Sequence, residues 1–183
     1  MVNILEMSNE EYKSKCKEIT IRYGRHETPF GECLIGITGV EKAVCFFWFV
    51  DDNFDECLEI LRKEWPQAKL SEDQTDTAKI AKQMFSNVER EKLSVLLRGT
   101  EFQIKVWKAL MKIPPGEVTT YSKIAEEIGH PTGIRAAGTA MKNNRIGLLV
   151  PCHRVTAKNG VNKYTWGSDR RTKIMEFEKQ KKW

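Results

Sequence analysis

Cys152 stands in the setting that a reactive cysteine requires. It follows Pro151, and His153 and Arg154 come directly after it. A cysteine attacks as its thiolate, so it needs a nearby base or positive charge. His153 supplies a candidate base and Arg154 a candidate cation. The spacing alone leaves two interpretations open: a nucleophilic cysteine, or a buried structural cysteine beside a surface histidine.

A histidine base usually needs a carboxylate to orient it. The periodicity near the C-terminus predicts a final helix over residues 168–179, and this helix carries two candidates, Glu176 and Glu178. The remaining cysteines offer no comparable site. The chain has five cysteines, an odd number, and no CxxC pair occurs. We therefore expect no disulfide framework and a reducing compartment, and we expect neither a metal nor a cofactor. We predict that Cys33, Cys45 and Cys57 are buried small hydrophobes and that Cys16 is an incidental exposed thiol.

Two short helices are predicted over residues 121–128 and 133–143, on either side of a tight turn. Ala125 and Gly129 have the spacing of a helix-turn-helix, in which Ala allows close helix packing and Gly makes the turn. The second helix is built of Ala, Gly and Thr, with Arg135 as its one long cation. Such a helix has a flat surface that can lie close to DNA. The pattern alone is also compatible with an ordinary helical hairpin.

The rest of the chain must position these residues. In the second half we predict a helix over 101–113, ended by Ile113–Gly116, and a strand-like apolar run over 146–150 that leads into Cys152. In the first half, short runs rich in Ile, Val, Phe and Trp predict a three-stranded antiparallel meander, two helices and a further strand. These elements span residues 17–23, 32–38, 42–50, 54–65, 73–88 and 93–97. We place the domain boundary between residues 1–97 and 98–183.

Charge is divided unevenly along the 183 residues. Residues 1–95 hold 13 lysines and arginines against 18 acidic residues, whereas residues 96–183 hold 17 against 7. A basic half suggests a polyanionic partner, although a merely solvated basic face fits equally well. No apolar run reaches the roughly 18 residues of a membrane helix, so we expect no membrane partner. The polar N-terminus does not resemble a secretory signal.

The motifs of the second half, taken together, resemble those of the O6-alkylguanine-DNA alkyltransferases, also called methylated-DNA–protein-cysteine methyltransferases. The resemblance covers residues 99–178 in order and at the family's spacing. Its motifs are Gly99–Gln103, Val106-Trp107, Ile113–Gly116, Tyr121, Arg135–Met141, Asn144, Pro151–Val155 and Tyr164–Gly167. The first half is less similar, but its order of strands and helices fits the family's ribonuclease-H-like domain.

The resemblance implies roles for five catalytic residues. Cys152 is the alkyl acceptor, and His153 draws the thiol proton through a bridging water. Glu178 holds that histidine. Tyr121 crowds the target phosphate and donates a proton to guanine N3, and Asn144 is the hinge between the recognition helix and the cysteine segment.

The resemblance also implies how DNA and the damaged base are held. Arg135 fills the gap that a flipped base leaves, and the helix around it contacts DNA through Ala136 and Thr139. Tyr121 takes part in this contact. The pocket for the base is shaped by Tyr164 and Thr165, and the backbone carbonyls of Cys152 and Val155 accept the guanine amino group.

The fold implied is α+β, with an N-terminal ribonuclease-H-like antiparallel sheet with helices and a C-terminal, mostly helical, winged helix-turn-helix domain. The implied function is DNA repair by a suicide enzyme, monomeric and without cofactor. It acts from the minor groove on double-stranded DNA that carries O6-alkylguanine. We expect it in the nucleus of a eukaryote or the cytoplasm of a prokaryote. Two alternatives remain: a non-catalytic damage-binding or transcription-factor module, and a cysteine hydrolase that uses Cys152 and His153.

Overall fold

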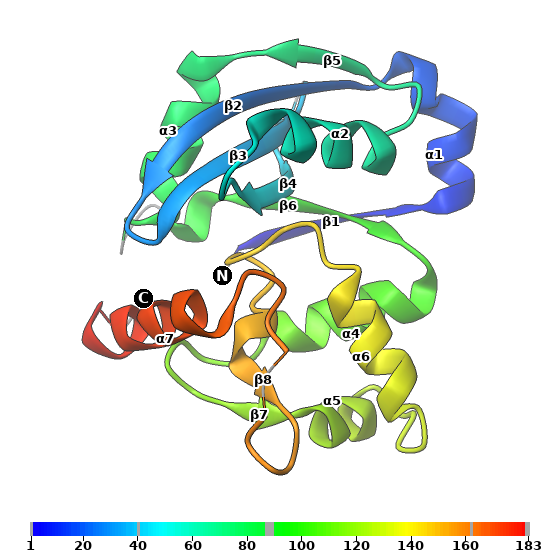
Figure 1. The fold of residues 1–183 in the computed structure, drawn as a ribbon. Coiled ribbons are helices and arrows are strands. Elements are labelled where there is room, and N and C mark those ends of the chain that lie inside the picture. The colour runs from blue at the N-terminus through cyan, green and yellow to red at the C-terminus, as the bar shows by residue number, and fades with distance from the viewer. Residues whose placement is uncertain (1, 40, 87–89, 162, 182–183) are drawn as a thin grey trace. The chain divides into compact units, whose positions relative to one another are not determined.

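The protein has an α+β fold, seen here in a computed structural model that describes residues 2–39, 41–86, 90–161 and 163–181 (Figure 1). The chain divides into two compact units, Met1–Arg98 and Gly99–Trp183. Among the described residues, no helix combines the length and the apolar character needed to cross a membrane.

The first unit is built on a six-stranded sheet in the order β1-β6-β4-β3-β2-β5. The predicted meander is confirmed, because β2 pairs antiparallel with β3 and β3 pairs antiparallel with β4. The strands are β1 (Asn3–Ser8), β2 (Thr20–Thr28), β3 (Gly31–Thr38), β4 (Val44–Phe49), β5 (Lys69–Glu72) and β6 (Ser94–Gly99).

The prediction of an antiparallel sheet is wrong for the sheet as a whole, which is mixed. β5 pairs parallel with β2, and β6 pairs parallel with β4. Parallel strands need a long crossover, and two helices supply it. The helix α2 (Phe54–Glu64) lies between β4 and β5 in the chain, and α3 (Gln74–Met84) lies between β5 and β6. Both helices were predicted, and each begins at a side-chain cap, Asn53 or Asp73.

These two helices pack on opposite faces of the sheet. Successive side chains of a strand point to opposite faces. In β2, Ile21 belongs to the apolar cluster that contains Leu61 of α2. His26, on the other face of β2, hydrogen-bonds through Nε2 to Thr77 Oγ1 of α3 at 2.7 Å. Gly24 shares this second face, where an added Cβ would lie 2.1 Å from Thr77 Oγ1, so α3 approaches closely only because Gly24 lacks a side chain.

Some boundaries in this unit differ from the predictions. Residues 16–18 form a 3-10 turn, so β2 begins at Thr20 rather than Lys17. The helix predicted over residues 73–88 ends at Met84, and Val88 lies outside the described residues. β1, β5 and the short helix α1 (Asn9–Lys15) were not predicted. The sequences of β5 and α1 are mostly polar, and β1 has only two alternating apolar residues, Leu5 and Met7, that pack on the core.

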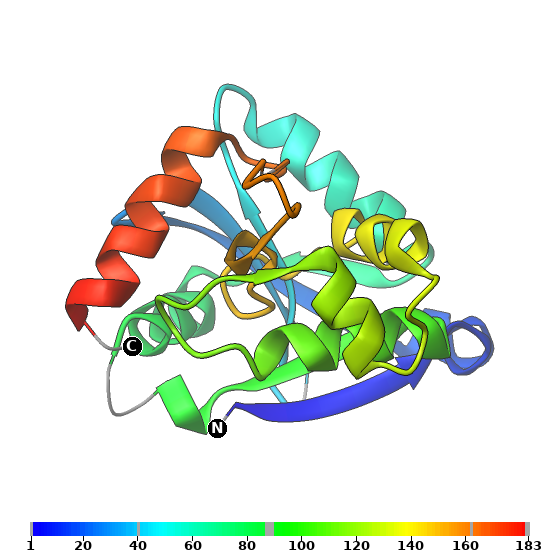
Figure 2. The same cartoon turned by 90° about the horizontal axis from the view of Figure 1, so that it is seen from below.

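The second unit is mostly helical, as Figure 2 shows from another side. It contains α4 (Glu101–Met111), α5 (Tyr121–Glu127), α6 (Ile134–Lys142) and α7 (Ser168–Lys181). These are the four predicted helices. α4 begins with a capping box in which Thr100 and Gln103 bond to each other's backbone amides. Its Trp107 donates through Nε1 to the carbonyl of Ala140 at 2.9 Å, which fastens α6 to α4.

A two-residue parallel ladder joins two distant parts of this unit. β7 (Thr119–Thr120) pairs with β8 (Val155–Thr156). β7 ends directly before Tyr121, and β8 begins directly after the 3-10 turn Cys152–Arg154. The ladder therefore brings the first residue of α5 beside the cysteine segment.

The strand-like run predicted over residues 146–150 is not a strand: Ile146 forms an isolated β-bridge, residues 147–149 form a turn and Val150 lies in a bend. Leu148 has a left-handed backbone (φ 64°). The amide of Val150 bonds back to the carbonyl of Ile146 at 3.0 Å, and the amide of Ile146 bonds to Asn144 Oδ1 at 2.9 Å. The apolar run is buried as a strand's would be, but Asn144 and the local turn satisfy the amides of Ile146 and Val150.

Candidate active site

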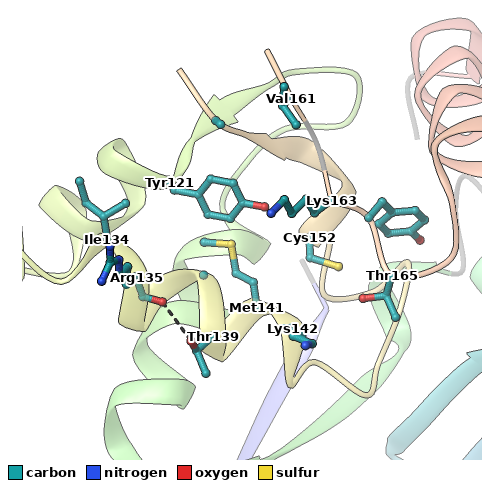
Figure 3. A pocket seen from close by; sticks show the side chains of 13 residues that line it. Tyr121, Ile134, Arg135, Thr139, Met141, Lys142, Cys152, Val161, Lys163 and Thr165 are labelled. Atoms are coloured by element: carbon teal, nitrogen blue, oxygen red, sulfur yellow. Dashed lines mark hydrogen bonds between the residues drawn. The ribbon is translucent and has the colours of Figure 1, made fainter. Parts of the chain in front are cut away.

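A cavity of about 700 Å³ opens in the second unit, with Cys152 in its wall (Figure 3). Six of the residues that the sequence singled out line it: Tyr121, Arg135, Thr139, Cys152, Tyr164 and Thr165. The other lining residues are Ile134, Gly138, Met141, Lys142, Ala157, Val161 and Lys163. Residues from α5, α6, the cysteine turn and the following loop thus meet in one space.

The other predicted site residues lie elsewhere. Asn144, His153, Val155 and Glu178 are buried in the unit, outside the lining of the cavity. Ala136 is exposed on α6 and does not line the cavity. The structure therefore divides the predicted set into side chains that line the cavity, side chains buried outside its lining, and the exposed side chain of Ala136.

The Cys152 thiol keeps its proton at neutral pH. Burial of the sulfur raises the pKa of the thiol to about 11. Three hydrogen bonds act in the opposite direction, from the Asn144 side chain and from the backbone amides of Cys152 and His153. Asn144 Nδ2 lies 3.5 Å from the sulfur and also donates to the carbonyl of Val150 at 2.8 Å. Attack by this sulfur requires a group that takes the proton.

His153, the residue after Cys152, forms a buried pair with Glu178 of α7. His153 Nε2 lies 2.8 Å from Glu178 Oε1, and both side chains are 0% exposed. Burial alone would raise the pKa of the Glu178 carboxyl, but it is lowered to about 2 by hydrogen bonds from His153 and Arg154, by the charge of Arg154 and by that of His153 when the imidazole is protonated. A carboxylate only accepts, so His153 carries a proton on Nε2. The geometry suits a base held by a carboxylate.

Of the two candidate glutamates on the last helix, Glu178 is the one that pairs with His153. Glu178 is buried against His153, whereas Glu176 is exposed on the same helix. Arg154, expected as a cation beside the thiol, is directed instead to Glu178. Its Nη2 donates to Glu178 Oε1 at 2.7 Å. Residues adjacent in sequence point different ways because Cys152–Arg154 forms a 3-10 turn, which separates neighbouring side chains by about 120°.

Tyr121 and Tyr164 contribute two phenols to the cavity. Burial, then the charge of a Cys152 thiolate, raises the pKa of Tyr121, while Arg171 lowers it. Burial also raises the pKa of Tyr164 well above its ordinary value. The rings of Tyr164 and His153 meet edge to face, with centroids 6.0 Å apart. Both phenols are therefore protonated at neutral pH and can act as donors.

The cavity is bordered by positive charge. Arg135, Lys142 and Lys163 line it, and no acidic side chain of the described ranges does. Arg135 was predicted to be the one long cation of its helix, which is wrong because Lys142 ends the same helix. Gly138 lies between them, where an added Cβ would be 3.9 Å from the Tyr121 ring. A helix with so little bulk gives a ligand access to the sulfur.

Arg171 is a site residue that the sequence analysis did not identify. It lies on α7, and its Nε donates to the carbonyl of His153 at 2.8 Å. Arg171 is one of several charged residues on the last helix, and nothing in the neighbouring sequence distinguishes it as a site residue.

The prediction that Cys33, Cys45 and Cys57 are buried is confirmed. Cys16 was expected to be exposed but is half-buried, with its sulfur 3.5 Å from Gln67 Oε1.

Two of the predicted pocket contacts concern backbone atoms. The carbonyl of Cys152 already accepts the amide of Val155. A carbonyl has two lone pairs, so this bond leaves one for a ligand. Within the part of the chain that the structure describes, no group of three or more His, Cys, Asp or Glu side chains is arranged to hold a metal ion.

Comparison with known proteins identifies close relatives over this site. A sequence model of the 6-O-methylguanine DNA methyltransferase DNA binding domain matches residues 101–180. The inducible methylated-DNA–protein-cysteine methyltransferase of Bacillus subtilis is 34% identical over 149 residues, which cover 79% of this chain and 83% of that protein. The regulatory protein ada of Salmonella typhimurium is 29% identical over 97% of this chain. The chain spans only about half of that protein, 51% of its length.

Solved structures give the same result. The O6-methylguanine methyltransferase of Mycobacterium tuberculosis superimposes with a TM-score of 0.68 at 30% identity, covering 88% of this chain and 93% of that one. Mycobacterium tuberculosis OGT in complex with DNA gives a TM-score of 0.65 at 27% identity, with the same coverage of both chains.

Proposed function

Because the chain belongs to the methylated-DNA–protein-cysteine methyltransferase family, we propose that it repairs O6-alkylguanine in DNA by moving the alkyl group to Cys152. One observation carries the proposal: the Cys152 sulfur stands at a cavity, while the next residue, His153, is buried and pairs with Glu178 of α7. This arrangement exposes one nucleophile and shields the groups that control its proton.

The reaction is a single displacement. The sulfur of Cys152 forms a bond to the alkyl carbon as the bond from that carbon to guanine O6 breaks. The thiol proton passes to His153 through a water molecule, and Glu178 stabilises the resulting imidazolium. Tyr121 donates a proton to guanine N3, which offsets the charge left on the base. The products are an S-alkylcysteine and guanine.

The protein is consumed in this reaction. A thioether has no easy route back to a thiol, so each chain reacts once. Asn144 contributes by hydrogen-bonding the sulfur and by fixing the turn that leads into the cysteine segment. The carbonyls of Cys152 and Val155, with Tyr164 and Thr165, orient the base.

A base inside a duplex cannot present O6 to the sulfur, so the damaged nucleotide must be rotated out. We propose that α6 approaches the minor groove, where Ala136 and Thr139 contact the DNA and Tyr121 crowds the target phosphate. Arg135 then enters the duplex and offsets the lost stacking. The small residues of α6 and the cations beside the cavity support this docking. The structure of Mycobacterium tuberculosis OGT with DNA supports DNA as the partner.

The two units take different parts in this proposal. The first, Met1–Arg98, corresponds to the family's ribonuclease-H-like domain. The second, Gly99–Trp183, is a winged helix-turn-helix domain formed by α5 and α6 and holds the whole active site. We propose that the protein acts as a monomer wherever the genome is held, the nucleus or the cytoplasm according to the organism.

The test is transfer from a defined substrate. Duplex DNA carrying one O6-methylguanine, labelled in the methyl group, is incubated with the protein, and label is counted on protein and DNA. We expect one methyl per chain and no further turnover. Cys152→Ala should transfer none while binding the duplex as before, and Cys16→Ala, the control, should react normally. Repeated turnover would instead indicate a hydrolase, and binding without transfer a damage-binding module.

A further inference from the structure

The turn Ile113–Gly116, which the proposed mechanism leaves without a role, reaches the buried histidine–glutamate pair. The amide of Gly116 donates to Glu178 Oε2 at 2.8 Å. The carbonyl of Ile113 accepts a hydrogen bond from Arg154 Nη1. One turn thus bonds to both the glutamate and the arginine that faces it.

The geometry of the turn depends on its sequence. Gly116 has a left-handed backbone (φ 80°), which favours glycine, and an added Cβ would lie 3.2 Å from Lys179 Cγ on α7. Pro114 and Pro115 fix two backbone angles before it. The turn is therefore a rigid support, and its Gly116 amide and Ile113 carbonyl hydrogen-bond to Glu178 and Arg154.

Arg154 and Glu178 form an extended ion pair on this support. Arg154 donates to the carboxylate from Nη2 at 2.7 Å and from Nε at 3.0 Å to Oε2 and 3.2 Å to Oε1. Arg154 is 4% exposed and Glu178 is 0% exposed. Buried charges must be compensated, and here one anion faces one cation that cannot lose its proton.

We infer that Arg154 is a positioning residue that, with the Ile113–Gly116 turn, neutralises Glu178 and so keeps His153 an uncharged base with its proton on Nε2. If Glu178 had no other cation, its charge would favour a protonated His153. An imidazolium cannot accept the thiol proton. Because Arg154 already balances the carboxylate, His153 can remain neutral until Cys152 reacts.

Among the described residues named above, the other charged and titratable groups of this site act in the same direction or carry no charge. Arg171, on α7, donates to the His153 carbonyl at 2.8 Å and adds a second positive charge. Tyr164 lies edge to face with the imidazole. It and Tyr121 are protonated at neutral pH, as is the Cys152 thiol. Glu178 is thus the one anion among these groups.

This inference rests on the proposed function, in which His153 accepts the proton of Cys152, but its test needs no DNA. Iodoacetamide alkylates the Cys152 sulfur with loss of iodide, and the thiol proton goes to His153. The rate is followed from pH 5 to 9 by mass spectrometry of the peptide that contains Cys152. In Arg154→Met we expect the midpoint of the acid limb to move up by about one pH unit. Arg154→Lys keeps a charge and should hold the midpoint near that of the unchanged protein.

Arg170→Met is the matched control. It removes one positive charge from α7, but Arg170 bonds the carbonyl of Trp166 and not Glu178. Its midpoint should not move. A folded Arg154→Met protein with an unmoved acid limb would overturn the inference, because a purely structural role lowers stability without shifting the limb. If the midpoint moves equally in Arg154→Met and Arg170→Met, the shift reflects only the loss of one positive charge from the protein, and the inference is overturned.

A second measurement does not depend on any variant folding. Nitrogen-15 NMR of the unchanged protein distinguishes an imidazolium from the neutral forms of His153. We expect the neutral form with the proton on Nε2 at pH 6. An imidazolium at that pH would refute the inference. Failure of methyl transfer from DNA would refute the proposed function. It would not change the NMR result, so the two failures can be distinguished.

Discussion

Cys152 holds its proton at neutral pH, because burial raises the pKa of the thiol to about 11. The residues proposed to remove this proton and the residue proposed to protonate guanine lie in different surroundings. His153 and Glu178 are buried in the unit, whereas Tyr121 lines the cavity. In the proposed reaction, the proton of the nucleophile and the proton for the leaving guanine are therefore controlled by different residues.

This separation predicts a selective effect of Tyr121→Phe. The variant keeps the ring but loses the phenol that protonates guanine. Transfer from methylated duplex DNA should slow by about a hundredfold, the lower range for a general acid. Alkylation of Cys152 by iodoacetamide should keep its rate, since no base leaves. Equal slowing of both reactions, measured under the same conditions, would assign Tyr121 to the thiol.

Local sequence predicted Cys152 as the nucleophile and His153 as its base, but it did not predict their partners. Pro151-Cys152-His153-Arg154 is continuous, so its chemistry can be recognised from one segment. The choice between Glu176 and Glu178 depends on the rotation of α7, and spacing left it open; the family resemblance indicated Glu178. The role expected for Arg154 was wrong because a 3-10 turn directs its side chain away from Cys152.

At the scale of elements, α6 combines access with charge. Its small residues pack α6 closely against its neighbours, and Ala137 and Ala140 are buried. Arg135 and Lys142 stand at its two ends and both line the cavity. The periodicity predicted α6 correctly. It could not predict that residues 147–149 form a turn, because that outcome depends on the hydrogen bonds of Asn144.

The position of Arg135 predicts a difference between substrates. Arg135→Ala should slow repair of duplex DNA by at least tenfold and leave reaction with free O6-benzylguanine within about twofold, because a free base needs no rotation out of a stack; the few kcal/mol that flipping costs set the scale. Lys142→Ala, at the other end of α6, is the matched control for lost charge. Both rates are read from alkylation of Cys152. If the two substrates slow alike in Arg135→Ala, the residue has no part in flipping.

At the scale of the whole molecule, the sequence predicted an α+β chain with an acidic first part and a basic second part. The mixed sheet was not predicted, because the parallel pairs join strands that are far apart in sequence. The ion pairs of both units share one property. Asp76 bonds Arg22, Lys42 and Lys79 in the first unit, and these bonds lower its pKa, as the contacts of Glu178 do in the second. Both units should therefore lose stability in acid.

Glu178 makes this loss testable. Its pKa falls from the ordinary 4.5 to about 2 on folding. A group whose pKa is lowered on folding stabilises the protein above its unfolded value, and that stabilisation is lost as the pH falls from 4.5 toward 2. Glu178→Gln leaves Arg154 buried without its counter-charge, which should cost about 3 kcal/mol at pH 6. Urea unfolding should show this difference shrinking by pH 3. A difference that is constant with pH would contradict the ionised pair.

The central claim is that the alkyl group ends on Cys152, and intact-protein and peptide mass spectrometry test it most directly. The protein is mixed with excess duplex DNA carrying O6-methylguanine and then digested. We predict that one methyl group is found, on the peptide with Cys152, and that the peptide with Cys16, the other cysteine that is not fully buried, stays unmodified. A methyl group on Cys16, a methyl group on any other residue, or an unmodified protein with demethylated DNA would contradict the account.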